Sequence, residues 1–426
     1  MKYIKKPTGR LKEKKDDIIK SVEKIIDDVR INGDKAIKKY SETFDKSKRD
    51  VFKVSREEID EAYKLVGTDL IEDIEFALKN IKKFANLQKD HLTSLDPVEI
   101  SPGVYAGHRV IPVDSCLAYV PGGTYPLFST ALMLITPAKI AGVGRVVAAS
   151  PVMKGTGSIN PQTLVAMDLA GADEIYAIGG AQAIAGFSYG TESLERVDMV
   201  VGPGNAYVAE AKRQCFGEVG IDFIAGPSEV MVIADETGHA EIIAFDLLAQ
   251  SEHDYNARAI LVTTDEDLGN KVLEFIEKEA GSSVEDLPRE AWKENGEIIL
   301  VESLAKACEI ANKWAPEHLE IMTRSPKDLV GKLRNYGSLF LGKEAAEVFG
   351  DYSSGTNHTL PTSGSARYTG GLWVGNFLKV LTYQHLNKEG LNEKIDLTAR
   401  LARGEGLKYH EKAALARRTL LEGEEI

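Results

Sequence analysis

Gln250 and His253 stand three residues apart at the end of an otherwise apolar segment, DLLAQSEH. If this segment is helical, both side chains lie on one face and can reach a common centre. An amide oxygen and an imidazole nitrogen are ligands for zinc, manganese or another divalent ion. Asp351, in the polar stretch FGDYSSGTNHTLPT, can approach the same centre from a neighbouring loop. These residue types predict a divalent-metal site, although a capped helix end or a buried structural histidine would also explain each residue taken alone.

Further acidic and imidazole groups occur together elsewhere in the sequence. Glu317 and His318 are adjacent in WAPEHLEIMT, and Glu405 precedes His410 in GEGLKYH near the end of the chain. His358 lies in the same polar stretch as the aspartate described above. A carboxylate and an imidazole beside a metal suit general acid–base chemistry near neutral pH. Metal-assisted hydrolysis, metal-assisted dehydrogenation and a metal that only stabilises the fold all remain open on these residues.

Glycine-rich turns follow predicted strands in four places. Their sequences are YVPGGTYPLFST, AIGGAQAIAG, VVGPGNAYVAEA and IAGPSEVMV. In a parallel sheet, ligands bind outside the carboxyl ends of the strands, where such turns are expected to lie. Glycine lets the backbone approach a ligand, and a following helix offers its first N–H groups to an anion. None of the turns matches the dinucleotide fingerprint, and each alone could be a plain turn, but together they favour a nucleotide-sized ligand.

Strands and helices alternate from about residue 112 onwards. The β-rich runs CLAYV, RVVAAS, EIYAI and VDMVVG are separated by helical segments, and the pattern starts again at EVMVIAD. Such alternation predicts an α/β fold whose parallel sheets are covered on both faces. The chain therefore reads as two α/β units in series, after about a hundred helical residues in which Ser55 and Glu58 form a capping box. The residues from about Leu372 also read as helices, and so short a tail must pack on the body or on a partner chain.

The composition excludes several classes of protein. The chain has 426 residues, 43% of them hydrophobic, and a formal net charge of -13 at pH 7. This charge argues against a nucleic-acid partner, because a phosphate-binding face needs a basic excess. Pro137, Lys139 and Arg145 interrupt the longest apolar stretch too soon for a membrane span.

The N-terminal segment and the cysteines indicate the cellular compartment. The basic start, MKYIKKPTGRLKEKK, lacks the apolar part of a signal peptide and reads as a solvated arm. Cys116, Cys215 and Cys308 are widely spaced, which suits a reducing environment. The sequence therefore predicts a cytoplasmic enzyme with neither a membrane nor a nucleic-acid partner.

Several longer segments resemble one family of enzymes. In chain order they are YVPGG, GGAQAIA, GPGNAYVAEAKRQ, GIDFIAGPSEVMVIAD, APEHLEI and GTNHTLPT. They resemble the histidinol dehydrogenase family, and the similarity extends from VRINGDKAIKKYSETFD to EGLKYHEKA, which is nearly the whole chain. The resemblance implies an enzyme that oxidises a polar alcohol with NAD and zinc.

The resemblance also implies roles for individual residues. The family's ligands for one zinc ion per subunit match Gln250, His253, Asp351 and, from the tail of the partner subunit, His410. Its general bases match Glu317 and His318. Its NAD contacts match Tyr119, Gln182 and Asn205, which lie on the glycine-rich turns. Its substrate contacts match Ser129, Ser228, Gln250, His253, His318, Asp351, His358, Glu405 and His410.

The family's domain organisation is expected here as well. It comprises two incomplete Rossmann-like parallel-sheet units, with a helical N-terminal region and a helical C-terminal tail. Residues 1–118 lead into the first α/β domain, and residues 119–228 form an inserted NAD-binding α/β domain. Residues 229–372 complete the first domain with the zinc and catalytic residues. Residues 373–426 form the tail, which is exchanged between the subunits of a homodimer.

The implied reaction is the oxidation of L-histidinol to L-histidine, by two hydride transfers to two NAD. His318 would remove the hydroxyl proton in the first step. Glu317 would then activate water to attack the bound aldehyde before the second hydride transfer. Zinc would orient the substrate rather than supply a hydroxide nucleophile.

Other segments leave the substrate and the reaction class open. Tyr255 stands where the family usually has proline, and GHRVIPVDS, VPGGTYPLFSTALM and TGGLWVGNFLKVLTYQ look more like relatives that oxidise other polar alcohols. Sulfopropanediol dehydrogenase, acting on 2,3-dihydroxypropane-1-sulfonate, is such a relative, whereas Ser129, APEHLEI and GDYSSGTNHTLPT favour histidinol. A zinc hydrolase could use Glu317 as its base but would have no use for the NAD contacts. A non-catalytic, zinc-stabilised dimer would leave the Glu317–His318 pair without a role.

Overall fold

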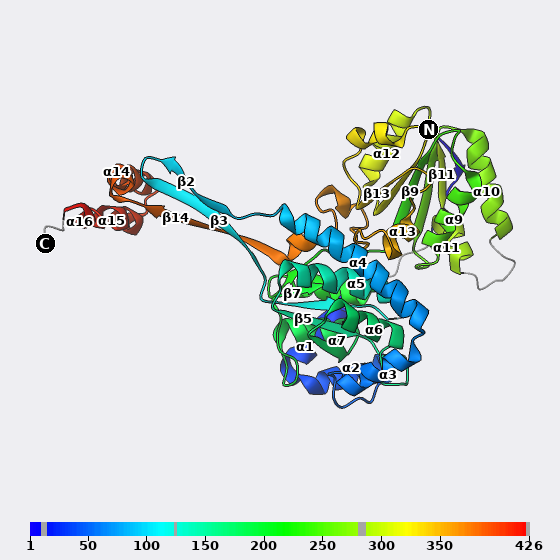
Figure 1. Cartoon of the computed structure of the whole chain (residues 1–426), viewed down its shortest axis with the longest axis horizontal. Coiled ribbons are helices and arrows are strands. Elements are labelled where there is room, and N and C mark those ends of the chain that lie inside the picture. Colours follow the sequence, from blue (N-terminus) through cyan, green and yellow to red (C-terminus); the bar gives the residue numbers. More distant parts are fainter. Residues whose placement is uncertain (10–14, 123–125, 280–286, 423–426) are drawn as a thin grey trace.

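The computed structural model describes residues 1–9, 15–122, 126–279 and 287–422. They form two bodies, each built around a sheet, and a projecting arm (Figure 1). The mixed α/β fold with parallel sheets confirms the fold class expected from the sequence. Residues 123–125 of the turn YVPGGTYPLFST lie outside the described residues. Within the described ranges, no helix is both long and apolar enough to cross a membrane.

The lower body in Figure 1 contains a five-stranded parallel sheet in the order β6-β5-β4-β7-β8. Its strands are β4 (Ser115–Tyr119), β5 (Arg145–Ser150), β6 (Glu174–Ala177), β7 (Met199–Val201) and β8 (Gly220–Ile221). The connecting helices are α5 (Phe128–Ala141), α6 (Pro161–Ala170), α7 (Gly180–Tyr189) and α8 (Ala206–Cys215). Cys116 and Ala118 pack into one core, whereas Leu117 and Tyr119 pack into another. Burial of both faces explains why these strands are continuous apolar runs.

Four N-terminal helices complete the cover of this sheet. They are α1 (Lys15–Asn32), α2 (Asp34–Asp45), α3 (Arg56–Leu65) and α4 (Thr68–Asp90). Helices α1 and α2 share a core with α7 and α8, and α3 and α4 share the opposite core with α5 and α6. The predicted capping box at the start of α3 is confirmed, because Ser55 and Glu58 each accept a hydrogen bond from the other's backbone N–H.

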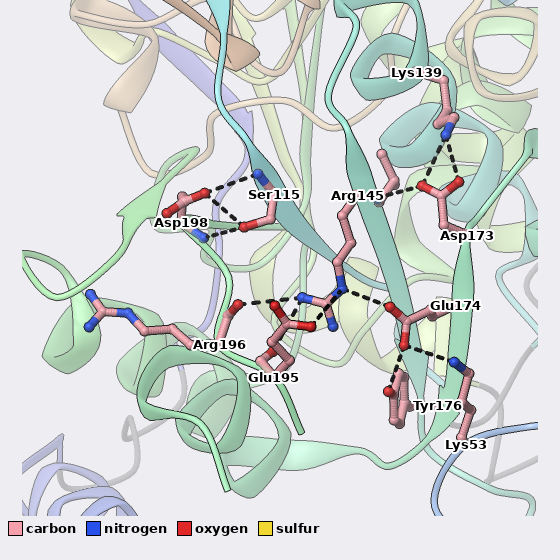
Figure 2. Close-up of polar contacts among 11 residues, drawn as sticks. Lys53, Ser115, Lys139, Arg145, Asp173, Glu174, Tyr176, Glu195, Arg196 and Asp198 are labelled. Atoms are coloured by element: carbon pink, nitrogen blue, oxygen red, sulfur yellow. Dashed lines mark hydrogen bonds and ion pairs between the residues drawn. The ribbon is translucent and has the colours of Figure 1, made fainter. Parts of the chain in front are cut away.

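Polar contacts occupy the edge of this sheet where its strands begin (Figure 2). Arg145, the first residue of β5, donates from Nε to Oε1 of Glu174 at the start of β6, over 2.7 Å. Lys53 also donates to Glu174, and at the start of β4 Ser115 donates to Asp198 from both its amide and its hydroxyl. The opposite edge, where the strands end, carries the glycine-rich turns and is the one open to a ligand.

The other body contains a six-stranded sheet in the order β1-β11-β10-β9-β12-β13. Its strands are β1 (Lys2–Lys5), β9 (Glu229–Ala234), β10 (Arg258–Thr263), β11 (Glu297–Leu300), β12 (His318–Met322) and β13 (Ser338–Leu341). All pairs are parallel except β1 with β11. The helices are α9 (Ala240–Ser251), α10 (Glu266–Glu279), α11 (Leu287–Asn295), α12 (Leu304–Trp314) and α13 (Glu347–Tyr352).

The N-terminal segment MKYIKK is not the solvated arm that its charge suggested. Residues Lys2–Lys5 form β1, which pairs with β11 at the edge of the six-stranded sheet. Tyr3 packs against the core on one face of this sheet, and Ile4 packs against the core on the other. The prediction was wrong because the lysines dominate the composition, whereas the pairing depends on the two apolar residues between them.

An antiparallel sheet of three strands, in the order β14-β3-β2, projects from the bodies and carries the last helices (Figure 1). Its strands are β2 (Leu95–Ser101), β3 (Val104–Pro112) and β14 (Leu378–Leu386). The helices at its end are α14 (Lys388–Gly404), α15 (Lys408–Ala416) and α16 (Thr419–Glu422). The predicted helical tail is confirmed for these helices, but β14 lies where helix was expected, and β2 begins within the N-terminal region that read as helical. Strand β14 pairs with β3 from Leu378↔Pro112 to Leu386↔Val104, a partner too distant in sequence for local patterns to reveal.

Candidate active site

Glu317 and His318 lie where β12 begins, beside the start of β9, and both side chains are buried. Oε2 of Glu317 accepts hydrogen bonds from the hydroxyl of Ser228 (2.6 Å) and from the amide of Glu229 (2.9 Å). Burial raises the pKa of Glu317 well above its usual value, although these two hydrogen bonds oppose the shift. Such a buried, hydrogen-bonded carboxyl group with a perturbed pKa is typical of acid–base residues in active sites.

The turn IAGPSEVMV, which supplies Ser228, leads into the start of β9. It lies beyond the carboxyl end of β8 in the five-stranded sheet, as expected, and also at the amino ends of the strands of the six-stranded sheet. The sequence did not reveal that this turn leaves one sheet and enters the other, so that it crosses between the two bodies.

The imidazole of His318 has one nitrogen engaged and the other free. Nδ1 donates to the carbonyl oxygen of Glu229 (3.3 Å), which fixes the proton on that nitrogen. Nε2 is buried and has no hydrogen-bond partner among the described residues. Burial lowers the pKa of His318 to about 3, so the ring is neutral at neutral pH. The unpaired Nε2 can therefore accept a proton from a bound ligand.

Helices α9 and α13 bring the three predicted metal ligands of this chain together. Gln250 lies in the last turn of α9 and is fully buried, whereas the side chain of His253, just beyond this helix, is 39% exposed. Asp351 lies in α13, and not in a polar loop as the sequence analysis expected. Ligand atoms of His253, Glu347 and Asp351 lie within 4.8 Å of one another.

Glu347 also belongs to this site, although no sequence pattern had singled it out. Its Oε1 lies 3.6 Å from Nδ1 of His318 and 3.8 Å from Nε2 of His253. It begins α13, and its amide donates to Oε1 of Glu320 (2.8 Å). The available signal was its spacing of one helical turn from Asp351, but this spacing indicates a shared face only if the segment is helical.

The donor groups fit a divalent cation. Burial is the main cause that raises the pKa of Asp351 to about 6. Burial also raises the pKa of Glu347, and neighbouring carboxylates raise it further. Burial also lowers the pKa of His253 and so favours the neutral ring that binds metals. A bound cation would offset the repulsion among the carboxylates. Imidazole, carboxylate and amide donors without a thiolate suit zinc or manganese.

Two further predicted residues join this site across the two bodies. Nε2 of His358, in the segment after α13, lies 3.1 Å from Oγ of Ser129 on α5. Asn357 strengthens the junction, because its side chain donates to the carbonyl oxygen of Met133 on the same helix (2.7 Å). Burial lowers the pKa of His358 to about 4, and its ring interacts electrostatically with His253. The serine and this histidine therefore form part of the same polar site.

Tyr119, Gln182 and Asn205 lie at the carboxyl ends of the five-stranded sheet or just beyond them. The hydroxyl of Tyr119 accepts a hydrogen bond from the amide of Gly180 (3.0 Å), and the side chain of Asn205 caps α8. The amide of Gln182 is buried, and neither its oxygen nor its nitrogen has a partner among the described residues. Such an unpaired buried amide is costly unless a ligand or water satisfies it.

A hollow of about 510 Å³ opens at the same edge of the sheet. Its lining includes Asp45, Gly122, Ser150 and Pro151, which come from the end of α2, the turn after β4 and the end of β5. Its size is in the range of small-molecule sites. The glycine-rich turns and this hollow together make the edge suitable for a nucleotide.

A buried ion pair fixes the turn GPGN in place. The side chains of Lys212 and Asp222 are 2% and 0% exposed and contact each other directly. Lys212 donates to the carbonyl oxygen of Gly202 (2.8 Å), and Asp222 accepts from the amide of the same glycine (2.8 Å). Gly202 has φ of 119°, and a Cβ there would lie 2.2 Å from the carbonyl oxygen of Tyr119. Only glycine lets this turn pass so close to the end of β4.

Glu405 and His410 are not part of this site within one chain. Both are exposed, and they lie among the helices at the far end of the arm (Figure 1). The expectation that they act in a partner subunit therefore stays a prediction.

Comparison with known proteins gives concordant matches over nearly the whole chain. The histidinol dehydrogenase family matches residues 8–418. A histidinol dehydrogenase of Clostridium acetobutylicum is 43% identical over 410 residues, which cover 96% of this chain and 94% of that protein. A sulfopropanediol 3-dehydrogenase of Ruegeria pomeroyi is 40% identical over 421 residues, with 97% and 95% covered. The crystal structure of histidinol dehydrogenase from Elizabethkingia anophelis superposes with a TM-score of 0.90 at 36% identity and covers 97% of this chain and 95% of its own.

Proposed function

The chain belongs to the histidinol dehydrogenase family, and from this premise we propose that it oxidises L-histidinol to L-histidine with NAD and zinc. The observation that carries the proposal is the convergence of the buried Glu317–His318 pair with His253 and Asp351 at one site. A dehydrogenase needs a base for the hydroxyl proton and a fixed position for the substrate, and this site supplies groups for both.

Gln250, His253 and Asp351 would hold the zinc ion together with the partner subunit's His410, and Glu347 offers a further carboxylate beside them. Bound zinc would fix and polarise the amino alcohol of the substrate. Ser129, Ser228 and His358 line the same site and would contact the substrate, and Glu405 would reach it from the partner's tail.

Tyr119, Gln182 and Asn205 would bind NAD, which accepts the hydride in each oxidation. The unpaired amide of Gln182 supports this assignment. The turn fixed by the Lys212–Asp222 pair brings Asn205 to the same edge.

In the first oxidation, Nε2 of His318 would take the proton of the substrate hydroxyl as the hydride departs. The neutral ring and its free Nε2 suit this role. In the second, Glu317 would take a proton from water, which adds to the bound aldehyde before the second hydride leaves. The hydrogen bonds from Ser228 and Glu229 hold this carboxyl group in position.

The proposal includes a homodimer in which the arms are exchanged. The arm and its helices expose many large apolar side chains, which a soluble monomer rarely leaves uncovered. They are Leu95, Val98, Ile100, Val380, Leu381, Tyr383, Leu386, Leu397, Leu401, Leu407, Tyr409 and Leu420. A second copy of the chain would cover these residues and bring Glu405 and His410 to the site of its partner. A cytoplasmic location stays a prediction, and the three free, buried cysteines are compatible with it.

The test is to count the NADH formed per L-histidinol consumed by the zinc-loaded protein. Two NADH per substrate, lost when a chelator removes the metal, would support the proposal. NAD binding without turnover would move the substrate to another polar alcohol, and 2,3-dihydroxypropane-1-sulfonate should be tried next because of the Ruegeria relative. A zinc protein that binds no NAD would instead favour a hydrolase.

Replacing Glu317 with glutamine should affect the second oxidation more than the first. An amide cannot take a proton from water, so oxidation of supplied aldehyde should fall by about 10²–10⁴-fold, while oxidation of the alcohol falls much less. Single-turnover NADH formation from histidinol and from histidinal measures the two steps separately. Glu309→Gln, at an exposed position of α12, is the control and should change neither. Equal losses in both steps would remove the proposed role of Glu317.

A further inference from the structure

The buried amide of Gln250 lies between the hydroxyl of Ser228 and the carboxylate of Glu347. One end of the amide is 3.0 Å from Oγ of Ser228, and the other end is 3.0 and 3.1 Å from the two carboxylate oxygens of Glu347. The backbone of Glu347 is held by Glu320, and the hydroxyl of Ser228 lies 2.6 Å from Glu317. The amide therefore connects the metal side of the site with the Glu317 side.

Two orientations of this amide are possible, and they differ in which end faces the metal ligands. The nitrogen can face Glu347 and donate to both carboxylate oxygens, while the amide oxygen accepts from Ser228. In the reverse orientation, the oxygen faces Glu347 and the nitrogen donates to Ser228. Only the reverse orientation lets Gln250 act as a ligand together with His253 and Glu347, because an amide binds metals through its oxygen.

The proton of the Ser228 hydroxyl distinguishes the two orientations. With the amide nitrogen towards Glu347, this single proton faces two acceptors, the oxygen of Gln250 and Oε2 of Glu317. With the amide nitrogen towards Ser228, the hydroxyl accepts from Gln250 and donates its proton to Glu317. The hydroxyl proton then has a single acceptor, and a cation supplies what the amide oxygen beside Glu347 lacks.

We propose that Ser228 is a positioning residue that holds the Gln250 amide with its oxygen towards the metal and links this ligand to Glu317. The hydroxyl accepts the amide N–H and donates to the carboxylate that activates water. A Glu317 carboxylate that accepts this hydrogen bond therefore favours metal binding. A bound metal in turn favours the hydrogen bond from Ser228 to Glu317. The inference rests on the proposed function, because it requires Gln250 to be a metal ligand.

The test measures the zinc affinity of the full-length protein by competition with a chromophoric chelator, without any activity assay. Ser228→Ala should weaken zinc binding by about 10–100-fold, the usual effect of losing a group that orients a metal ligand. Ser228→Thr keeps the hydroxyl and should restore most of this affinity. The melting temperatures of the metal-free proteins should stay alike, which separates positioning from a general loss of stability.

Repeating the Ser228→Ala substitution in a protein with a changed metal ligand makes the test independent of the threonine variant. In Gln250→Glu, either oxygen of the new carboxylate can bind the metal, so no orientation has to be fixed. Ser228→Ala should then weaken zinc binding little further in the Gln250→Glu protein. The same 10–100-fold loss in both backgrounds, or no loss in the wild-type background, would overturn the role of Ser228.

Failure of the proposed function gives a different result. If the wild-type protein binds no zinc, or if Gln250→Ala leaves its zinc affinity unchanged, Gln250 is not a ligand and the proposed zinc site itself is wrong. If Gln250→Ala weakens binding and Ser228→Ala does not, the zinc site stands and only the positioning role is lost.

Discussion

Replacing His318 with alanine is expected to lower kcat for histidinol oxidation by about 10²–10⁴-fold, the range for loss of a general base. The reason is the geometry of the ring: Nδ1 is held by the carbonyl of Glu229, so Nε2 alone is free to accept the substrate proton. Steady-state NADH formation measures the effect.

Zinc and NAD should still bind after this change, because His318 is not among the proposed contacts of either. Zinc affinity and NAD affinity should therefore stay close to wild type, which identifies the loss as catalytic. His91→Ala, at an exposed position after α4, is the control and should leave kcat unchanged. A decrease of less than about tenfold for His318→Ala would leave the proposed base without support.

Heterodimers that combine His410→Ala in one subunit with Gln250→Ala in the other should regain about half of wild-type activity, although each variant alone is nearly inactive. If the arms are exchanged, one of the two sites combines the intact Gln250 of one subunit with the intact His410 of the other. The second site carries both substitutions. Differently tagged, co-purified heterodimers allow a direct assay.

The matched control combines Gln250→Ala with Asp351→Ala. Both residues lie in the body of the chain, so each site of that heterodimer lacks one of them and no activity should return. Recovery in the control pair, or none in the His410 pair, would contradict the exchange of arms. The exposed positions of Glu405 and His410 at the end of the arm make this experiment decisive for the oligomeric part of the proposal.

The location of the proposed catalytic pair illustrates the limit of general rules about sheets. The glycine-rich turns led us to expect ligands at the carboxyl ends of the strands, and Tyr119 and Gln182 do lie at that edge of the five-stranded sheet. Glu317 and His318 instead lie where β12 begins. Helix α9 returns Gln250 to the same edge, so the two bodies contribute opposite edges of their sheets to one functional region.

Features that depend on neighbouring residues could be predicted from the sequence alone. Apolar runs of strand length between helical segments predicted the parallel sheets, and Ser55 with Glu58 predicted the start of α3. The spacing of Gln250 and His253 predicted that they share a site, and the two residues lie in the last turn of α9 and just beyond its end. These patterns are local, so they can be read without knowing what the chain packs against.

The contacts between distant segments could not be predicted in this way and were seen first in the folded chain. Strand β14 forms because β3 offers it a partner, and Glu347 enters the site because Glu320 fixes the first turn of α13. The pairing of Ser129 with His358 likewise joins two bodies that are far apart in sequence. Such contacts depend on the packing of the whole core and on long-range strand pairing. Neither can be predicted from a short segment of sequence.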